Sequence, residues 1–188
     1  MKKIFKYIVI CTLLFGLIGI GVKFSGPSIV NHDLSYTKNY TIQEATDAAS
    51  NIVIGKIISN SKDTYDSVGN AYPKTDSVIH IEKNIKGNLS GDIIFSQEGG
   101  LDKKTNKIHI MGGYKILTPG QQYLFFINKY SNDSPPGYLQ ENPILEGKYY
   151  SIGGAPQVYR VEGKMAKNVV MPERDQELSN IEQQVVKK

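Results

Sequence analysis

Beyond residue 50, this chain is dominated by short runs of β-branched and aromatic residues, separated by Gly, Pro and Asn turn signals. The two most apolar runs cover residues 52–58 (IVIGKII) and 122–128 (QYLFFIN), and their length and composition are typical of buried strands. Gly55 inside the first run indicates a bulge or sharp curvature, the feature by which a sheet bends toward closure. Further strands are expected at residues 76–85, 92–97, 107–111, 149–152 and 157–161. The pattern predicts a small closed or half-closed barrel.

Alternation within the strand at residues 76–85 predicts which side chains face the core. Ile79, Ile81 and Ile85 fall on one face of this strand, and the other face carries Val78, His80 and Glu82.

Two helices are expected to flank the barrel. Residues 41–44 (TIQE) form a capping-box pattern, which predicts a helix over residues 41–50 with Ile42, Ala45 and Ala49 along one side. Pro172 is placed to start a second helix, whose apolar stripe is Leu178, Ile181 and Val185. The fold class is therefore mainly β: a small OB-like β-barrel with a short N-terminal flanking helix and a C-terminal helix, preceded by an N-terminal hydrophobic helix.

The N-terminus has the layout of an export signal. A basic start, MKKIFK, precedes the uncharged run Tyr7 to Val22. Its 16 residues would span about 24 Å as a helix, against roughly 30 Å for the hydrocarbon core of a bilayer. A cleaved signal peptide and an N-terminal membrane anchor both remain open, and both place residues 27–188 outside the cytoplasmic membrane. We expect a signal or anchor at residues 1–24, a tether at 25–40 and one domain at 41–188.

The net charge of +4 belongs to the export segment. Four lysines (Lys2, Lys3, Lys6 and Lys23) precede the first acidic residue, Asp33, so the remaining 18 basic residues balance 18 acidic ones. A neutral body lacks the cationic groove that nucleic-acid binding uses, so no nucleic-acid partner is expected. The single Cys, Cys11, lies in the apolar run, which leaves the predicted domain without any thiol.

Four segments together resemble the netrin-like domains, the group that contains the tissue inhibitors of metalloproteinases. They are residues 43–58 (QEATDAASNIVIGKII), 78–87 (VIHIEKNIKG), 92–95 and 117–124 (LTPGQQYL). The same pattern is similar to that of secreted proteins of Gram-positive bacteria. The resemblance implies an OB-type barrel with flanking helices. In the inhibitors an N-terminal, disulfide-held Cys chelates the protease zinc, and this chain has no Cys beyond Cys11 to do so.

The sequence contains neither G-x-S-x-G nor H-E-x-x-H, the motifs of a serine nucleophile and of a catalytic zinc site. We therefore expect no catalytic residues, no cofactor and no enzymatic activity. One alternative remains open, because His80, Glu82 and His109 would form a zinc-type site if their strands were neighbours. That arrangement would make the protein a metal-dependent hydrolase.

Aromatic and amide side chains late in the chain are the candidate ligand surface: Tyr138, Gln140, Tyr149, Tyr150, Tyr159 and Arg160. We expect loops 59–75 and 130–146 to present the ligand. The leading hypothesis is a non-enzymatic, exported or membrane-tethered binding module whose partner is an extracytoplasmic protein, peptide or glycan. A protease-inhibitory or regulatory domain acting on a secreted or membrane enzyme is the alternative.

Overall fold

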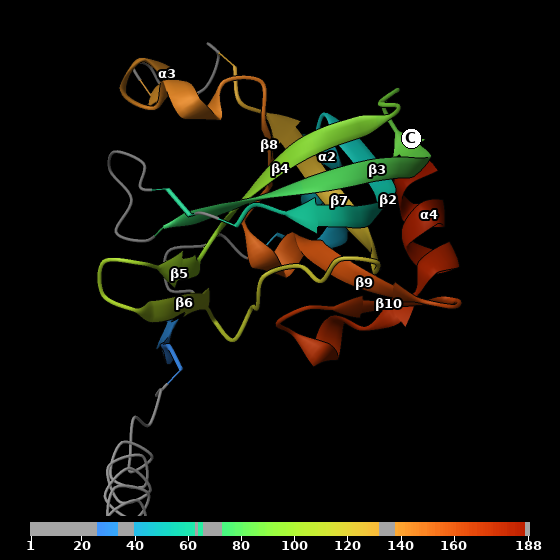
Figure 1. The fold of residues 1–188 in the computed structure, drawn as a ribbon. Coiled ribbons are helices and arrows are strands. Elements are labelled where there is room, and N and C mark those ends of the chain that lie inside the picture. The colour runs from blue at the N-terminus through green and yellow to red at the C-terminus, as the bar shows by residue number, and fades with distance from the viewer. Residues whose placement is uncertain (1–25, 34–39, 63, 66–72, 132–137, 187–188) are drawn as a thin grey trace, which may run out of the picture.

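The computed structural model describes residues 26–33, 40–62, 64–65, 73–131 and 138–186 (Figure 1). The predicted signal or anchor at residues 1–24 lies outside these residues. Within the described ranges, no helix combines the length and the apolar character needed to cross a bilayer.

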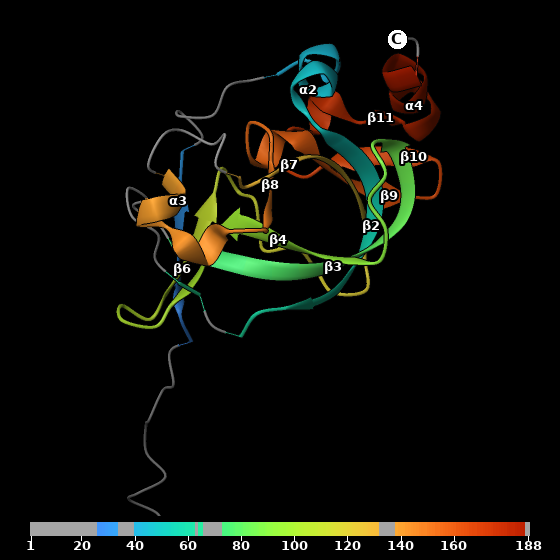
Figure 2. The same ribbon diagram turned by 90° about the horizontal axis from the view of Figure 1, so that it is seen from above.

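A closed five-stranded barrel forms the body of the protein (Figure 2). Its strands are β2 (Asn51–Asn60), β3 (Lys74–Lys86), β4 (Asp92–Glu98), β7 (Gln122–Lys129) and β8 (Tyr149–Ser151). Around the barrel they follow the order β7-β2-β3-β4-β8, and β8 closes the ring by pairing with β7. Every pairing is antiparallel except that of β4 with β8. This order, with its one parallel pair, is that of the OB-fold, so the predicted barrel is confirmed, while the predicted N-terminal hydrophobic helix lies outside the described residues.

Further strands extend this barrel. The strand β9 (Val158–Glu162) pairs with β7, and β10 (Met165–Asn168) and β11 (Gln176–Glu177) continue that edge. A separate small sheet has the order β1-β6-β5, formed by β1 (Ser28–His32), β6 (Lys107–Met111) and β5 (Gly100–Asp102). Figure 2 shows this small sheet beside the barrel, on the side away from the C-terminal helix.

Two cores explain why the runs at β2 and β7 are nearly continuous in apolar residues. On β7, Phe125 and Ile127 point into the barrel, while Leu124 and Phe126 point outward into a second apolar cluster. The outer cluster is covered by two helices, so both faces of β7 and β2 are buried, and the usual alternation of polar and apolar residues is absent.

The covering helices are α2 (Ile42–Ala48) and α4 (Leu178–Val186), which contact each other and pack on the same side of the barrel (Figure 2). Thr41 caps α2 with the predicted capping box: its Oγ1 accepts from Glu44 N, and Thr41 N donates to the Glu44 carboxylate. A short helix, α3 (Tyr138–Glu141), and three 3-10 turns, Pro143–Leu145, Ala155–Gln157 and Pro172–Arg174, complete the fold.

The start of the last helix was wrong by six residues. Pro172 begins only a 3-10 turn, and α4 starts at Leu178. Between them the Asp175 carboxylate accepts from the backbone N–H of Asn168, and β11 pairs with β10, which holds the chain extended. The predicted stripe is nevertheless correct, because Ile181 and Val185 are buried.

The predicted face of β3 was wrong at Ile85. Ile79 and Ile81 lie in the barrel core, whereas Ile85 packs in the outer cluster. The pairing with β2 skips Glu82 and Ile85, so a bulge shifts the alternation along this strand and reverses the side on which Ile85 lies.

Two expected connecting segments contain strand. Part of the predicted tether forms β1, which runs parallel to β6 with Ser28 opposite Lys107. Both ends of the predicted loop 59–75 belong to strands, since β2 extends to Asn60 and β3 begins at Lys74. A polar composition hid these strands, because neither alternates clearly between apolar and polar residues.

Candidate ligand-binding cavity

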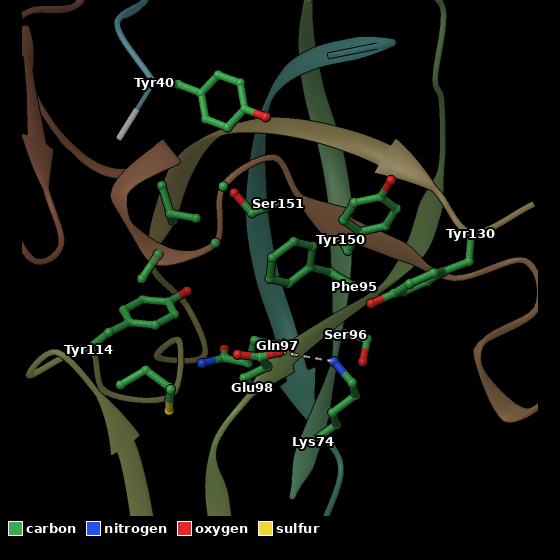
Figure 3. A pocket seen from close by; sticks show the side chains of 15 residues that line it. Tyr40, Lys74, Phe95, Ser96, Gln97, Glu98, Tyr114, Tyr130, Tyr150 and Ser151 are labelled. Carbon is green, nitrogen blue, oxygen red and sulfur yellow. Dashed lines mark ion pairs between the residues drawn. The ribbon is translucent and has the colours of Figure 1, made fainter. Parts of the chain in front are cut away.

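A cavity of about 350 Å³ opens beside the barrel, between the end of β4, β8 and the segment that follows β6 (Figure 3). This volume is at the lower end of the range for small-molecule sites, roughly 300–1,000 Å³. Its wall consists of Tyr40, Lys74, Phe95, Ser96, Gln97, Glu98, Met111, Tyr114, Tyr130, Tyr150, Ser151, Gly153, Gly154, Ala155 and Val158.

Lys74 places a buried cation in this wall. It is the first residue of β3 and lies in register with Glu98, the last residue of β4. Its side chain is 3% exposed, and Nζ lies 3.7 Å from Glu98 Oε1, an ion pair drawn in Figure 3. Burial lowers the pKa of the Lys74 ammonium, and the charge of Glu98 opposes that shift.

Gln97 contributes an amide donor without a partner. Its Oε1 accepts from the backbone N–H of Leu117 at 3.1 Å, which fixes the orientation of the amide. The buried Nε2 then has no hydrogen-bond partner among the described residues. A side-chain amide that satisfies only its acceptor in a buried position is rare in folded proteins.

Two hydroxyls of the same wall are also buried without a hydrogen-bond partner among the described residues. Tyr114 Oη and Ser151 Oγ are buried, and neither has a hydrogen-bond partner in the part of the chain that the structure describes. Burial raises the pKa of Tyr114 well above its ordinary value, so this hydroxyl keeps its proton. Each unpartnered buried polar group costs about 1–3 kcal/mol, and here three of them line one cavity.

Aromatic rings form the apolar part of the wall. The rings of Tyr130 and Tyr150 lie 4.4 Å apart between centroids and are tilted by 35°. Phe95, which is 2% exposed, contacts Phe125 of the barrel core and anchors this wall to the interior. The cavity therefore joins polar donors to a flat apolar surface.

A hydrogen-bonded network next to the cavity holds the strands that carry these groups. Tyr65 Oη contacts Asp76 Oδ1 at 2.8 Å and Ser96 Oγ at 2.7 Å, and Lys148 Nζ donates to Asp76 Oδ2 at 2.6 Å. The Lys148 ammonium also lies 4.4 Å from the centroid of the Tyr65 ring. This network ties β3 and β4 to the residue just before β8.

Of the predicted ligand-surface residues whose side chains the structure describes, Tyr150 alone lines this cavity. Tyr149 faces the barrel core, and Tyr159 is fully buried in the outer cluster. Arg160 is exposed on β9, where it pairs with Glu162 and borders a different groove. Gln140 is exposed on α3, which begins at Tyr138, whose side chain lies outside the described residues.

The predicted metal residues lie on different sheets. His80 on β3 contacts Asp92, and Glu82 accepts from Gln122. His109 lies on β6, and its ring stacks on that of His32. Strands β3 and β6 are not neighbours, and no group of three or more His, Cys, Asp or Glu suited to a metal occurs among the residues described. The condition for a zinc site at His80, Glu82 and His109, that their strands are neighbours, is therefore not met in the described sheets.

Sequence reasoning missed Lys74, Gln97 and Tyr114. Residues 73–77 (PKTDS) have the composition of a loop, so a buried lysine there gives no signal in the sequence. Each of the two loops predicted to present the ligand contributes one residue to the cavity wall. Lys74 lies at the end of loop 59–75, and Tyr130 lies at the start of loop 130–146.

The described part of the chain forms a closed OB-type barrel with flanking helices and a cavity lined by polar and aromatic residues. No protein-family model matches it, and a comparison with curated proteins found no match.

Proposed function

We propose that this protein is a non-enzymatic binding module that acts outside the cytoplasmic membrane and holds its ligand in the cavity between β4, β8 and Tyr114. The observation that carries the proposal is the group of three buried polar atoms without described partners in one wall: Gln97 Nε2, Tyr114 Oη and Ser151 Oγ.

The energetics of these groups support a binding role. Since each unpartnered group costs about 1–3 kcal/mol, three of them would destabilise the fold without any structural benefit. Phe or Met at such positions would pack without this cost. A ligand that supplies hydrogen-bond partners recovers the free energy, which is the reason that binding sites carry polar groups of this kind.

The sequence supports the proposed location and class of the protein. The basic start and apolar run of residues 1–24 support export, either as a secreted protein or anchored in the cytoplasmic membrane. The OB-type strand order with two packed helices agrees with the netrin-like resemblance, and we include membership of that group in the proposal. The ligand would be an extracytoplasmic peptide, glycan or protein segment small enough to enter the cavity.

A cavity-filling variant tests the proposal. Ser151→Phe would occupy the space beside Tyr150, and Ser90→Phe adds the same group in an exposed turn outside the cavity wall. The purified protein and both variants would be screened against a peptide library and a glycan array. We expect at least one class of ligand to bind the protein and Ser90→Phe but not Ser151→Phe. Equal binding by a folded Ser151→Phe variant would contradict the placement of the site.

A further inference from the structure

The cavity has an excess of hydrogen-bond donors. Lys74 carries three N–H donors, and its ion pair with Glu98 spans 3.7 Å, which is longer than a hydrogen bond. Gln97 adds two more donors on Nε2, and its acceptor is already occupied by Leu117 N. Lys74 lies on β3 and Gln97 on the adjacent strand β4, and both residues line the cavity. The ligand must therefore bring acceptors to this place.

The ion pair of Lys74 with Glu98 can open to admit an anion. The side chain of Glu98 is 43% exposed, against 3% for Lys74. Glu98 can turn into water at low cost, whereas the Lys74 ammonium stays in the wall of the cavity. An incoming carboxylate would replace Glu98 as the partner of Lys74 and would make shorter, charge-assisted hydrogen bonds.

The other residues of the cavity wall indicate the chemistry of the rest of the ligand. Tyr114 and Ser151 offer hydroxyls, and Tyr130, Tyr150 and Phe95 offer rings. A cavity of about 350 Å³ has room for a small molecule or the end of a chain, but not for a folded partner.

We infer that the cavity binds a carboxylate attached to an apolar or aromatic group, with the carboxylate oxygens on Lys74 Nζ and Gln97 Nε2 and the apolar group against Tyr130 and Tyr150. The inference rests on the proposed binding function. A small organic acid and the C-terminal residue of a peptide share this chemistry.

A matched pair of probes isolates the carboxylate. N-acetyl-L-phenylalanine and N-acetyl-L-phenylalaninamide differ only in that group, and methyl β-D-glucoside tests a neutral ligand rich in hydroxyls. Titration of the full chain by calorimetry should show the acid binding at least about tenfold more tightly than the amide, as expected for a charge-assisted contact. Lys74→Met should remove that preference. Lys56→Met, which alters an exposed lysine of β2, should keep it.

The outcomes separate this inference from the proposed function. Equal binding of acid and amide, or binding of the glucoside alone, would overturn the carboxylate inference and leave a binding module. Binding of none of the three would also overturn it, while the cavity-filling variant decides the proposed function by itself. The two sources of the ligand are distinguished by 3-phenylpropionate and the peptide Ala-Ala-Phe: tighter binding of the peptide assigns a chain terminus, and tighter binding of the free acid a small metabolite.

Discussion

Lys74 and Glu98 face each other across β3 and β4, and their charged atoms lie 3.7 Å apart, with the lysine buried and the glutamate half in water. The cost of removing the ammonium from water outweighs the attraction of Glu98, since the pKa of Lys74 is lowered in spite of this partner. The pair is therefore not expected to stabilise the fold.

Lys74→Met should leave the free energy of unfolding unchanged or raise it by about 1 kcal/mol, because it removes a buried charge whose partner remains solvated. Urea denaturation of the variant and the parent measures this difference. Lys56→Met, on the exposed side of β2, serves as the control and should change stability by less than about 0.5 kcal/mol. A loss of more than about 2 kcal/mol in Lys74→Met would show that the lysine holds the fold together.

The same lysine predicts a pH dependence. Its pKa in the folded protein is below the ordinary value of 10.5, so the unfolded chain binds more protons between these two values. The contribution of Lys74 to stability should therefore rise as the pH increases through its folded pKa toward 10.5. Denaturation at a series of alkaline pH values should show this rise in the parent, relative to Lys74→Met. Parallel curves for the two proteins would exclude it.

Tyr114→Phe removes a hydroxyl that has no described partner, so the variant should be as stable as the parent or more stable by about 1 kcal/mol. Tyr123→Phe is the matched control, since Tyr123 Oη accepts from the backbone N–H of Thr118 at 3.2 Å. That variant should lose about 0.5–1.5 kcal/mol. Thermal unfolding of both variants compares them. If Tyr114→Phe were the more damaging change, the hydroxyl would have a structural role.

The elements that could be predicted from the sequence are those whose apolar composition directly reflects their burial. Residues 122–128 are apolar throughout because both faces of β7 are covered, and the strand lies where it was expected. Ile85 was misplaced because a bulge is set by the pairing of β3 with β2, which no local pattern encodes.

The site was less predictable than the fold. Tyr149 and Tyr159 were candidate binding residues in the sequence, but both are packed in the cores. The sequence around a tyrosine does not show whether its ring will be buried or will face a ligand. Lys74 and Gln97 line the same cavity only because β3 pairs with β4. Tyr114 reaches this cavity from the segment between β6 and β7. Sites of this kind depend on long-range pairing.

Gly55 should be intolerant of a side chain. A Cβ there would overlap Ile79 Cγ2 and lie 3.0 Å from the carbonyl oxygen of His80. Gly55→Ala should therefore lower the free energy of unfolding by about 1–3 kcal/mol, as overpacking in a core does. Gly26→Ala is the control, because no atom lies within 4 Å of its added Cβ. Urea denaturation compares the two, and equal stability would mean that β2 and β3 separate easily at this point.

A pair of histidines should make the docking of β1 sensitive to pH. His32 Nε2 lies 3.0 Å from His109 Nδ1, with the rings stacked, and this contact joins β1 to β6. Burial lowers the pKa of His32 and the neighbouring His109 lowers it further, while Asp33 acts in the opposite direction; Asp102 of β5 also interacts with His109.

Because the pKa of His32 is below 6.5 when β1 is docked, the undocked strand binds the proton more readily. Docking should be strongest above pH 6.5 and weaken as the pH falls through the docked pKa. Hydrogen exchange, expressed as protection factors, should show the amide of Gly112, which donates to His32 O, less protected at pH 5 than at pH 7. The double variant His32→Gln/His109→Gln cannot titrate and should show the same protection at both values. Equal protection of Gly112 in the parent at the two pH values would refute the coupling.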